Sequence, residues 1–163
     1  MDRLILLRHG KAEADAASGR DFDRALTGRG RRDALVVAKA LDRAGVRPDL
    51  VLVSPAARAA QTWEAMAEVF PQARVEQMLD LYEIGPDAIL TLARNEADGA
   101  GTVMVVGHNP GLGVLAAWLS QDAPQGEGRA RIAEGFPTAA AAVIGFSPPA
   151  FAVYTPKDLG GGA

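Results

Sequence analysis

Both histidines of this chain stand at the end of an aliphatic run, and each has a glycine beside it. His9 follows Arg8 after the run "LILL", and His108 closes the segment "TVMVVGH". Arg58 lies four residues beyond Ser54, which ends a third run of this kind. An imidazole with an unprotonated nitrogen is a nucleophile, and an arginine offers a fixed fork of donors that matches phosphate oxygens. These residue types point to an anion site in which one imidazole could take a phosphoryl group and yield it to water.

Short strands and amphipathic helices in alternation must position these residues. Three aliphatic runs show no polar alternation, which is typical of strands covered on both faces: residues 4–7, 50–53 and 103–106. Four helices are expected between and after them: residues 28–44, a helix to Phe70 capped by Ser54 with Pro55 in its first turn, and helices after Gly85 Pro86 and Asn109 Pro110. The first of these is expected to turn Ala34, Leu35, Ala38 and Leu41 toward the core.

This alternation predicts an α/β fold with three layers, α/β/α, around a mainly parallel central sheet. Two further strands are expected at residues 138–146 and 151–154, joined by a turn at 147–149, with an irregular connection at 124–135. We expect a single domain over residues 1–158, followed by a flexible glycine-rich tail at 159–163.

In a mainly parallel sheet, ligands bind in the crevice outside the carboxyl ends of the strands. Arg8, His9, Ser54, Arg58 and His108 all follow strand ends, so we expect them to meet at one edge, where helix N-termini add backbone donors. Neighbouring arginines would disfavour the protonated form of an imidazole and so help to keep it neutral. Its second nitrogen would be held by a hydrogen bond, in our interpretation to a backbone carbonyl.

The spacing of possible ligands argues against a metal centre. The two histidines are 99 residues apart (9 to 108), cysteine is absent, and no closely spaced carboxylate set accompanies either ring. We therefore expect no metal and no cofactor. The arginines must then carry the electrostatic stabilisation of the transferring group.

Composition excludes several classes of partner. A net charge of −3 argues against a general nucleic-acid binder, and no apolar run is long enough for a secretion signal or a membrane span, so we expect a cytoplasmic protein. The absence of cysteine fits a reducing compartment. One local basic cluster stands out: Arg24, Arg29, Arg31 and Arg32. It could be a solvated helix face or a docking patch for an acidic or phosphorylated partner.

Four short motifs in this order resemble the histidine phosphatase superfamily, with its phosphoglycerate mutase-like fold. They are "RHG" at residues 8–10, "SPAARAAQT" at 54–62, "LYE" at 81–83 and "GHNP" at 107–110. The longer segments "LLRHGKAE", "DFDRALTGRGRRDA", "VGHNPGL" and "GFPTAAAAV" are similar to the short bacterial phosphohistidine phosphatases of the SixA type. The resemblance covers residues 4 to about 155, and the ordered set is far more specific than any one motif.

The resemblance implies a role for each matching residue. His9 would be the nucleophile that becomes phosphorylated, and Arg8, Arg58 and His108 would form the phosphate pocket. Glu83 falls where longer relatives place a proton donor for the leaving group, although some SixA-type proteins lack an acid there. The alternative for Glu83 is an exposed or helix-capping carboxylate ahead of Pro86.

Lys11 and Asn109 match the family pattern too, either at the edge of the pocket or as ordinary polar loop residues. Two positions depart from it: glycine stands at position 10 where close relatives often carry alanine, and Ala25 replaces a proline. The second change leaves the loop before Leu26 less rigid.

The spacing leaves little chain for a lid, because 25 residues separate Arg58 from Glu83 and 25 more separate Glu83 from His108. We therefore expect a shallow, open pocket that admits a phosphorylated side chain. The resemblance implies phosphohistidine on a histidine-containing phosphotransfer domain as substrate. A broad phosphatase of small phosphate esters and a non-catalytic phosphoprotein-binding module stay open as alternatives.

Overall fold

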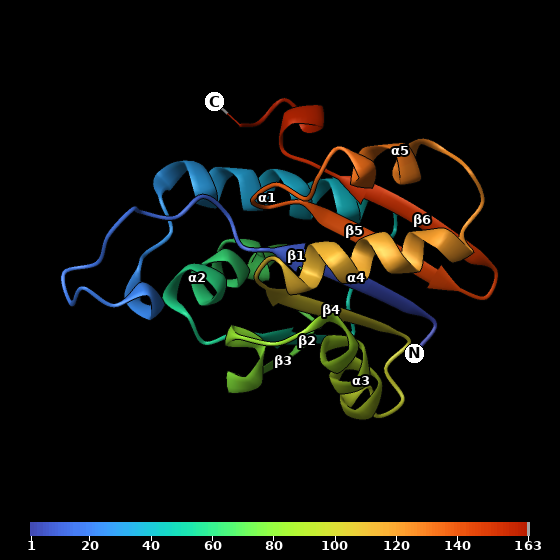
Figure 1. The fold of residues 1–163 in the computed structure, drawn as a ribbon, viewed down its shortest axis with the longest axis horizontal. Coiled ribbons are helices and arrows are strands. Elements are labelled where there is room, and N and C mark those ends of the chain that lie inside the picture. The colour runs from blue at the N-terminus through green and yellow to red at the C-terminus, as the bar shows by residue number, and fades with distance from the viewer. Residues whose placement is uncertain (163) are drawn as a thin grey trace.

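The computed structural model describes residues 1–162 and is built on a six-stranded sheet (Figure 1). The strands are β1 (Arg3–Arg8), β2 (Leu50–Val53), β3 (Arg74–Gln77), β4 (Thr102–Gly107), β5 (Ala141–Phe146) and β6 (Pro149–Tyr154), in the order β3-β2-β4-β1-β5-β6. Strands β3, β2, β4 and β1 are mutually parallel, whereas β5 and β6 are antiparallel additions at one side. The expected mainly parallel sheet is confirmed.

Helices cover both faces of this sheet, which gives three layers. The α-helices are α1 (Gly28–Arg43), α2 (Ala57–Met66), α3 (Pro86–Glu96), α4 (Gly111–Leu119) and α5 (Glu127–Ala133). Short 3₁₀ turns occupy Asp21–Asp23, Ala67–Val69, Leu79–Tyr82, Ser120–Asp122 and Lys157–Leu159. Helices α1 and α2 pack on one face, and α3, α4 and α5 pack on the other. No helix among residues 1–162 is both long and apolar enough to cross a membrane.

Strand β1 shows why its sequence lacks alternation. Leu4 and Leu6 belong to the core beneath α3 and α4, while Ile5 and Leu7 belong to the core beneath α1 and α2. All four side chains are fully buried, because helices cover both faces of the strand. The three predicted strands at residues 4–7, 50–53 and 103–106 are therefore confirmed.

The helix ends differ from the sequence prediction in detail. Helix α2 begins at Ala57 rather than at Pro55 and gives way at residue 67 to a 3₁₀ turn. In α1, Val37 is fully buried where the prediction had Leu35, which is only half-buried. Residues two apart point to nearly opposite sides of a helix, and the buried face of α1 follows the spacing of Ala34, Val37, Ala38 and Leu41, which leaves Leu35 off that face.

Two elements were not expected at all. Helix α5 lies within residues 124–135, where we predicted an irregular connection, and that prediction is wrong. Its helix-forming residues, 129–134, follow two glycines and are too few to show a helical period, but Ile132 packs into the core and Gly128 lies close against Phe151 of β6. Strand β3 was missed because it is a mostly exposed edge strand and has no apolar run.

The C-terminal residues pack back onto α1. Gly161 N donates to Pro156 O at 2.7 Å, and Gly162 N donates to Oδ1 of the buried Asp33 at 2.9 Å. The flexible tail expected at residues 159–163 stays a prediction, and its last residue, Ala163, lies outside the described residues.

Candidate active site

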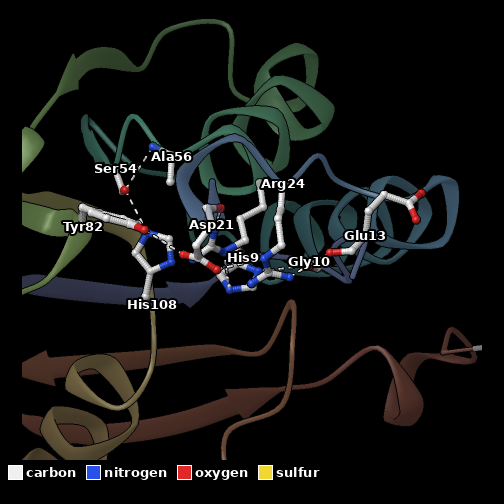
Figure 2. A network of polar contacts seen from close by, with 10 residues as sticks. His9, Gly10, Glu13, Asp21, Arg24, Ser54, Ala56, Tyr82 and His108 are labelled. Atoms are coloured by element: carbon white, nitrogen blue, oxygen red, sulfur yellow. Dashed lines mark hydrogen bonds and ion pairs between the residues drawn. The ribbon is translucent and has the colours of Figure 1, made fainter. Parts of the chain in front are cut away.

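Three parallel strands end at the same edge of the sheet, and a polar residue follows each of them. In the register, Leu7 of β1 lies opposite Val106 of β4, which in turn lies opposite Val53 of β2. His9, Ser54 and His108 therefore leave the sheet at nearly the same level. Figure 2 shows the two imidazoles with their polar contacts, and their ring centroids are 5.2 Å apart.

The protonation pattern of His9 is fixed by its two contacts. Nδ1 lies 2.8 Å from the carbonyl oxygen of Gly10, which can only accept, so Nδ1 carries the proton. Nε2 lies 3.3 Å from Nε of Arg58, which can only donate. His9 thus presents the lone pair of Nε2 on the side where the arginine lies.

Several groups favour the neutral form of His9. The side chain is only 8% exposed, and this burial is the main cause that lowers the pKa of His9 to about 4. The positive charge of Arg58 acts in the same direction, and the hydrogen bond to Gly10 opposes it. At neutral pH the ring is therefore neutral, and its unprotonated Nε2 is chemically able to act as a nucleophile.

Arg58 is buried, and the 3₁₀ turn at Asp21–Asp23 holds its guanidinium. Its two terminal nitrogens donate to the backbone oxygen of Asp21 at 2.8 Å and to Oδ2 of the same residue at 3.0 Å. The Tyr82 hydroxyl donates to that Oδ2 at 2.7 Å. This clamp leaves Nε of Arg58 directed at His9.

Asp21 is a carboxylate held in the ionised form. Hydrogen bonds from Tyr82, Arg24 and Arg58 hold the pKa of Asp21 well below its usual range, and Asp21 in turn raises the pKa of Tyr82. The Asp21 side chain is still 53% exposed, so it forms part of the rim of the site. Because it stays ionised, it can orient cations but is a poor proton donor.

His108 lies between Ser54 and His9. Its Nε2 is 2.8 Å from the Ser54 hydroxyl, and its ring meets that of Tyr82 edge to face. Its Nδ1 is buried and has no hydrogen-bond partner among the residues described. Burial, followed by the neighbouring His9 and Arg58, lowers the pKa of His108 to about 3, so this ring is also neutral near pH 7.

Arg8 approaches the site from the end of β1. One terminal nitrogen donates to the backbone oxygen of Phe136 at 3.1 Å, an oxygen that also accepts from the Asn109 side chain. The Nε of Arg8 is buried and lacks a partner within residues 1–162. Together with Nδ1 of His108, it is one of two buried donor-capable nitrogens at this edge whose hydrogen bonds remain to be made.

A pocket of about 530 Å³ opens beside these groups, with Arg58, His108, Tyr82, Asp21 and Glu83 in its lining. Glu83 is exposed at the mouth. A neighbouring pocket of about 660 Å³ contains Arg8 in its wall and shares Asn109 with the first. His9 lines neither pocket, but its ring lies against Arg58 and His108, which both line the smaller one.

The remaining sequence candidates divide between the site and the surface. Lys11 is exposed, and its backbone carbonyl accepts from Thr27 near the start of α1. In the basic cluster, Arg24 donates to Asp21, and Arg29 pairs with Asp33. The other two members, Arg31 and Arg32, are exposed on α1. The four arginines therefore do not form one uniform patch.

Sequence reasoning missed Asp21, Tyr82 and the contact of Ser54 with His108. Asp21 and Tyr82 lie in the motif segments "DFDR" and "LYE". Neither residue directly follows a predicted parallel strand, so the positions of the strand ends did not predict them. Within residues 1–162, no cluster of three or more histidine, aspartate or glutamate side chains is arranged to hold a metal ion. The groups that the edge does assemble, a neutral nucleophilic nitrogen beside two guanidinium groups, suit a tetrahedral anion.

Comparisons with known proteins agree with this geometry. The family model described as histidine phosphatase superfamily (branch 1) matches residues 4–89. Phosphohistidine phosphatase SixA of Escherichia coli is 33% identical over 120 residues, which cover 72% of this chain and 73% of SixA. An uncharacterised chloroplastic protein of Arabidopsis thaliana is 36% identical over 128 residues, which span 72% of this chain but only 59% of the plant protein.

A solved structure extends the similarity to almost the whole chain. The protein from Agrobacterium tumefaciens described as a SixA phosphohistidine phosphatase superimposes with a TM-score of 0.82 at 32% identity, over 94% of this chain and 98% of that one. The match includes the sheet and the helices on both of its faces, so the phosphoglycerate mutase-like architecture is confirmed.

Proposed function

This chain belongs to the histidine phosphatase superfamily as a phosphatase of the SixA type, and from that premise we propose that it hydrolyses phosphohistidine through a phosphorylated His9. The observation that carries the proposal is the state of the His9 ring, which has its proton on Nδ1 at the Gly10 carbonyl and its Nε2 lone pair beside Arg58. An imidazole held in this way attacks without first losing a proton.

The reaction has two displacements. Nε2 of His9 forms a bond to phosphorus while the bond from phosphorus to the substrate's nitrogen breaks, and that electron pair leaves with the substrate imidazole, which takes up a proton. Water then attacks the phosphorylated His9, which releases inorganic phosphate and restores the ring. Arg8, Arg58 and His108 hold the phosphoryl oxygens, and no metal ion is required in the proposal because the two guanidinium groups supply the positive charge.

The pocket lining favours phosphohistidine over anionic metabolites. Asp21 and Glu83 both line it, and its one arginine, Arg58, already pairs with Asp21. A leaving imidazole that becomes cationic on protonation is attracted by these carboxylates, whereas a leaving group with its own carboxylate is repelled. We therefore propose a phosphorylated protein, such as a phosphotransfer domain, as the substrate. We also propose a cytoplasmic location for this chain.

Glu83 is assigned as the proton donor for substrates with a poorer leaving group. It is exposed at the pocket mouth, where a leaving oxygen would emerge. A phosphoramidate bond is labile once its imidazole is protonated, so it needs little help from a general acid. Small phosphate esters remain a second candidate class, because a pocket of about 530 Å³ has room for them.

A substrate panel tests the proposal. The protein is offered a phosphotransfer domain that carries phosphohistidine, a set of small phosphate esters and an aryl phosphate. The kcat/KM values for these substrates are then compared. We expect the highest kcat/KM for the phosphohistidine protein, and we expect Glu83→Gln to slow the aryl phosphate more than phosphohistidine. Higher kcat/KM on a metabolite would favour the ester phosphatase. Binding of the phosphoprotein with no turnover on any substrate would favour a binding module.

A further inference from the structure

Ser54 is a fully buried serine directly at the active-site edge. Its hydroxyl oxygen accepts from the backbone N–H of Ala56 at 3.3 Å and lies 2.8 Å from Nε2 of His108. Figure 2 shows both contacts converging on this one oxygen. The oxygen therefore already acts as an acceptor for one group while it touches a ring nitrogen whose protonation can vary.

Among the residues described, the Ser54 hydroxyl has one hydrogen-bond acceptor for its proton, which is Nε2 of His108. If Nε2 carried a proton instead, it would donate to Ser54, and the buried serine would be left with a proton and no acceptor. Nδ1 of His108, which has no partner within residues 1–162, would then present a lone pair. The arrangement in which Ser54 donates leaves fewer buried polar groups unsatisfied, so it is the favoured one.

We propose that Ser54 is a positioning residue that keeps the proton of His108 on Nδ1, so that this nitrogen donates a hydrogen bond to the transferring phosphoryl group. The inference deepens the proposed function, because it rests on a phosphate that binds beside His9. It also explains why the buried Nδ1 of His108 has no hydrogen-bond partner within residues 1–162. In the proposal, this nitrogen donates to the oxyanion when one is bound.

The opposite tautomer would harm the reaction. A lone pair on Nδ1 would face the negatively charged phosphoryl oxygens, and the two would repel each other. A second proton on the His108 ring would remove this repulsion. The nearby His9 and Arg58 and the burial of the site disfavour that charged form. The hydroxyl of Ser54 thus decides whether His108 attracts or repels the substrate.

Nuclear magnetic resonance of the unmodified protein tests the inference directly. The chain has only two histidines, so the ring nitrogens in a long-range ¹H–¹⁵N spectrum are assigned by comparison with His9→Ala. We expect His108 to show a protonated Nδ1 and an unprotonated Nε2 at pH 7. A protonated Nε2 on His108 would overturn the inference without any variant of Ser54 being made.

Three variants test the consequence for binding, with tungstate as a tetrahedral oxyanion probe. Ser54→Ala is expected to weaken tungstate binding about tenfold and to shift His108 toward the Nε2-protonated form, whereas Ser54→Thr keeps the hydroxyl and should retain both properties. Ser120→Ala is the matched control, because Ser120 is also buried and its hydroxyl donates to Ala117 O, away from the site. Tungstate binding should be unchanged in Ser120→Ala.

The outcomes separate this inference from the proposed function. Unchanged tungstate affinity and an unchanged His108 spectrum in folded Ser54→Ala would overturn the role of Ser54, whatever the enzyme hydrolyses. If instead His108 has the expected tautomer and Ser54→Ala loses tungstate affinity, but no phosphorylated substrate is turned over, the inference about Ser54 stands and the proposed phosphatase reaction fails.

Discussion

The two imidazoles of the site differ in what holds their second nitrogen. His9 is held by a backbone carbonyl, that of Gly10, and its other nitrogen, Nε2, accepts from Nε of Arg58. His108 is held by a side chain, Ser54, and its other nitrogen has no partner among residues 1–162. A carbonyl can only accept, so the tautomer of His9 is determined by the backbone itself. A hydroxyl can do both, so the tautomer of His108 depends on the surroundings of Ser54.

This contrast separates two roles that look alike in the sequence. Both rings are neutral, both follow a parallel strand and both stand beside a glycine. In the proposed assignment both also carry their proton on Nδ1, but His9 turns Nε2 toward the phosphate and His108 turns Nδ1 toward it. One ring therefore offers a lone pair and the other offers a proton, so one suits a nucleophile and the other an electrophilic partner.

Replacing His9 by alanine is the strongest test of this division. Without the nucleophilic nitrogen no phosphoenzyme can form, so turnover should fall on the order of 10⁵-fold or more, and the acid-labile phosphate label should vanish. The label is measured after brief exposure to a radiolabelled phosphohistidine donor and acid quenching. A full yield of label in His9→Ala would place the nucleophile elsewhere.

Replacing His108 by alanine should slow the reaction without removing the intermediate. Loss of one preorganised donor to the transferring group typically costs about 10²–10³-fold in kcat. His9 keeps its lone pair, so the label should still accumulate on it, only more slowly, in a rapid-quench time course. Complete absence of label in folded His108→Ala would show that the second ring is required for the attack itself.

The pH dependence should also distinguish the two rings. Protonation inactivates the His9 nucleophile, so kcat/KM should fall about tenfold per pH unit only below the His9 pKa of about 4. Protonation of His108, whose pKa is lowered to about 3, adds a proton to a ring that already donates and should cause no separate loss. Proton chemical shifts of both rings, followed from pH 8 to pH 3, check this assignment. A midpoint near 6.5 for either ring would contradict it.

The same shifts have a consequence for stability. Both histidines bind protons more weakly in the folded state than in the unfolded state, whose pKa is about 6.5. Protons therefore favour unfolding, and the free energy of unfolding should fall as the pH drops from about 6.5 toward 4. Urea titrations at several pH values measure this slope, which should become smaller in His9→Ala and His108→Ala.

The site residues at the strand ends could be predicted from the sequence, because two simple patterns determine where they lie. Aliphatic runs without alternation identified β1, β2 and β4, and parallel pairing brings their carboxyl ends to one edge. Arg8, His9 and His108 follow directly from that argument. Arg58 follows one helical turn later, because α2 starts just after β2.

The partners that hold those residues could not be predicted from the sequence, because their contacts depend on side-chain packing between distant segments. Asp21 reaches Arg58 from a loop 37 positions away in the chain, and Ser54 reaches His108 across 54 positions. Helix α5 and strand β3 were missed for a related reason. Their own sequences carry weak signals, and packing against β6 or pairing with β2 stabilises them.

The glycines beside the two histidines provide the smallest and most local test of the contrast. A Cβ on Gly10 would lie 2.7 Å from the backbone oxygen of Gly30 in α1, which cannot move aside easily. A Cβ on Gly107 would meet Cδ1 of Leu112 at 3.6 Å, an ordinary contact distance. Gly10→Ala should therefore lower the free energy of unfolding by about 1–3 kcal/mol. Gly107→Ala should be neutral or stabilise by up to about 1 kcal/mol.

Urea unfolding of the two variants, with equal slopes against denaturant, checks these values. The His9 side of the site is the constrained one, because the carbonyl of Gly10 accepts the His9 proton and its N–H donates to Thr62 at 2.9 Å. A shift of this residue away from Gly30 would therefore also disturb the nucleophile, and Gly10→Ala should lose activity in proportion to its loss of stability. Equal stability in the two variants would mean that α1 yields at Gly30 and that position 10 tolerates a Cβ.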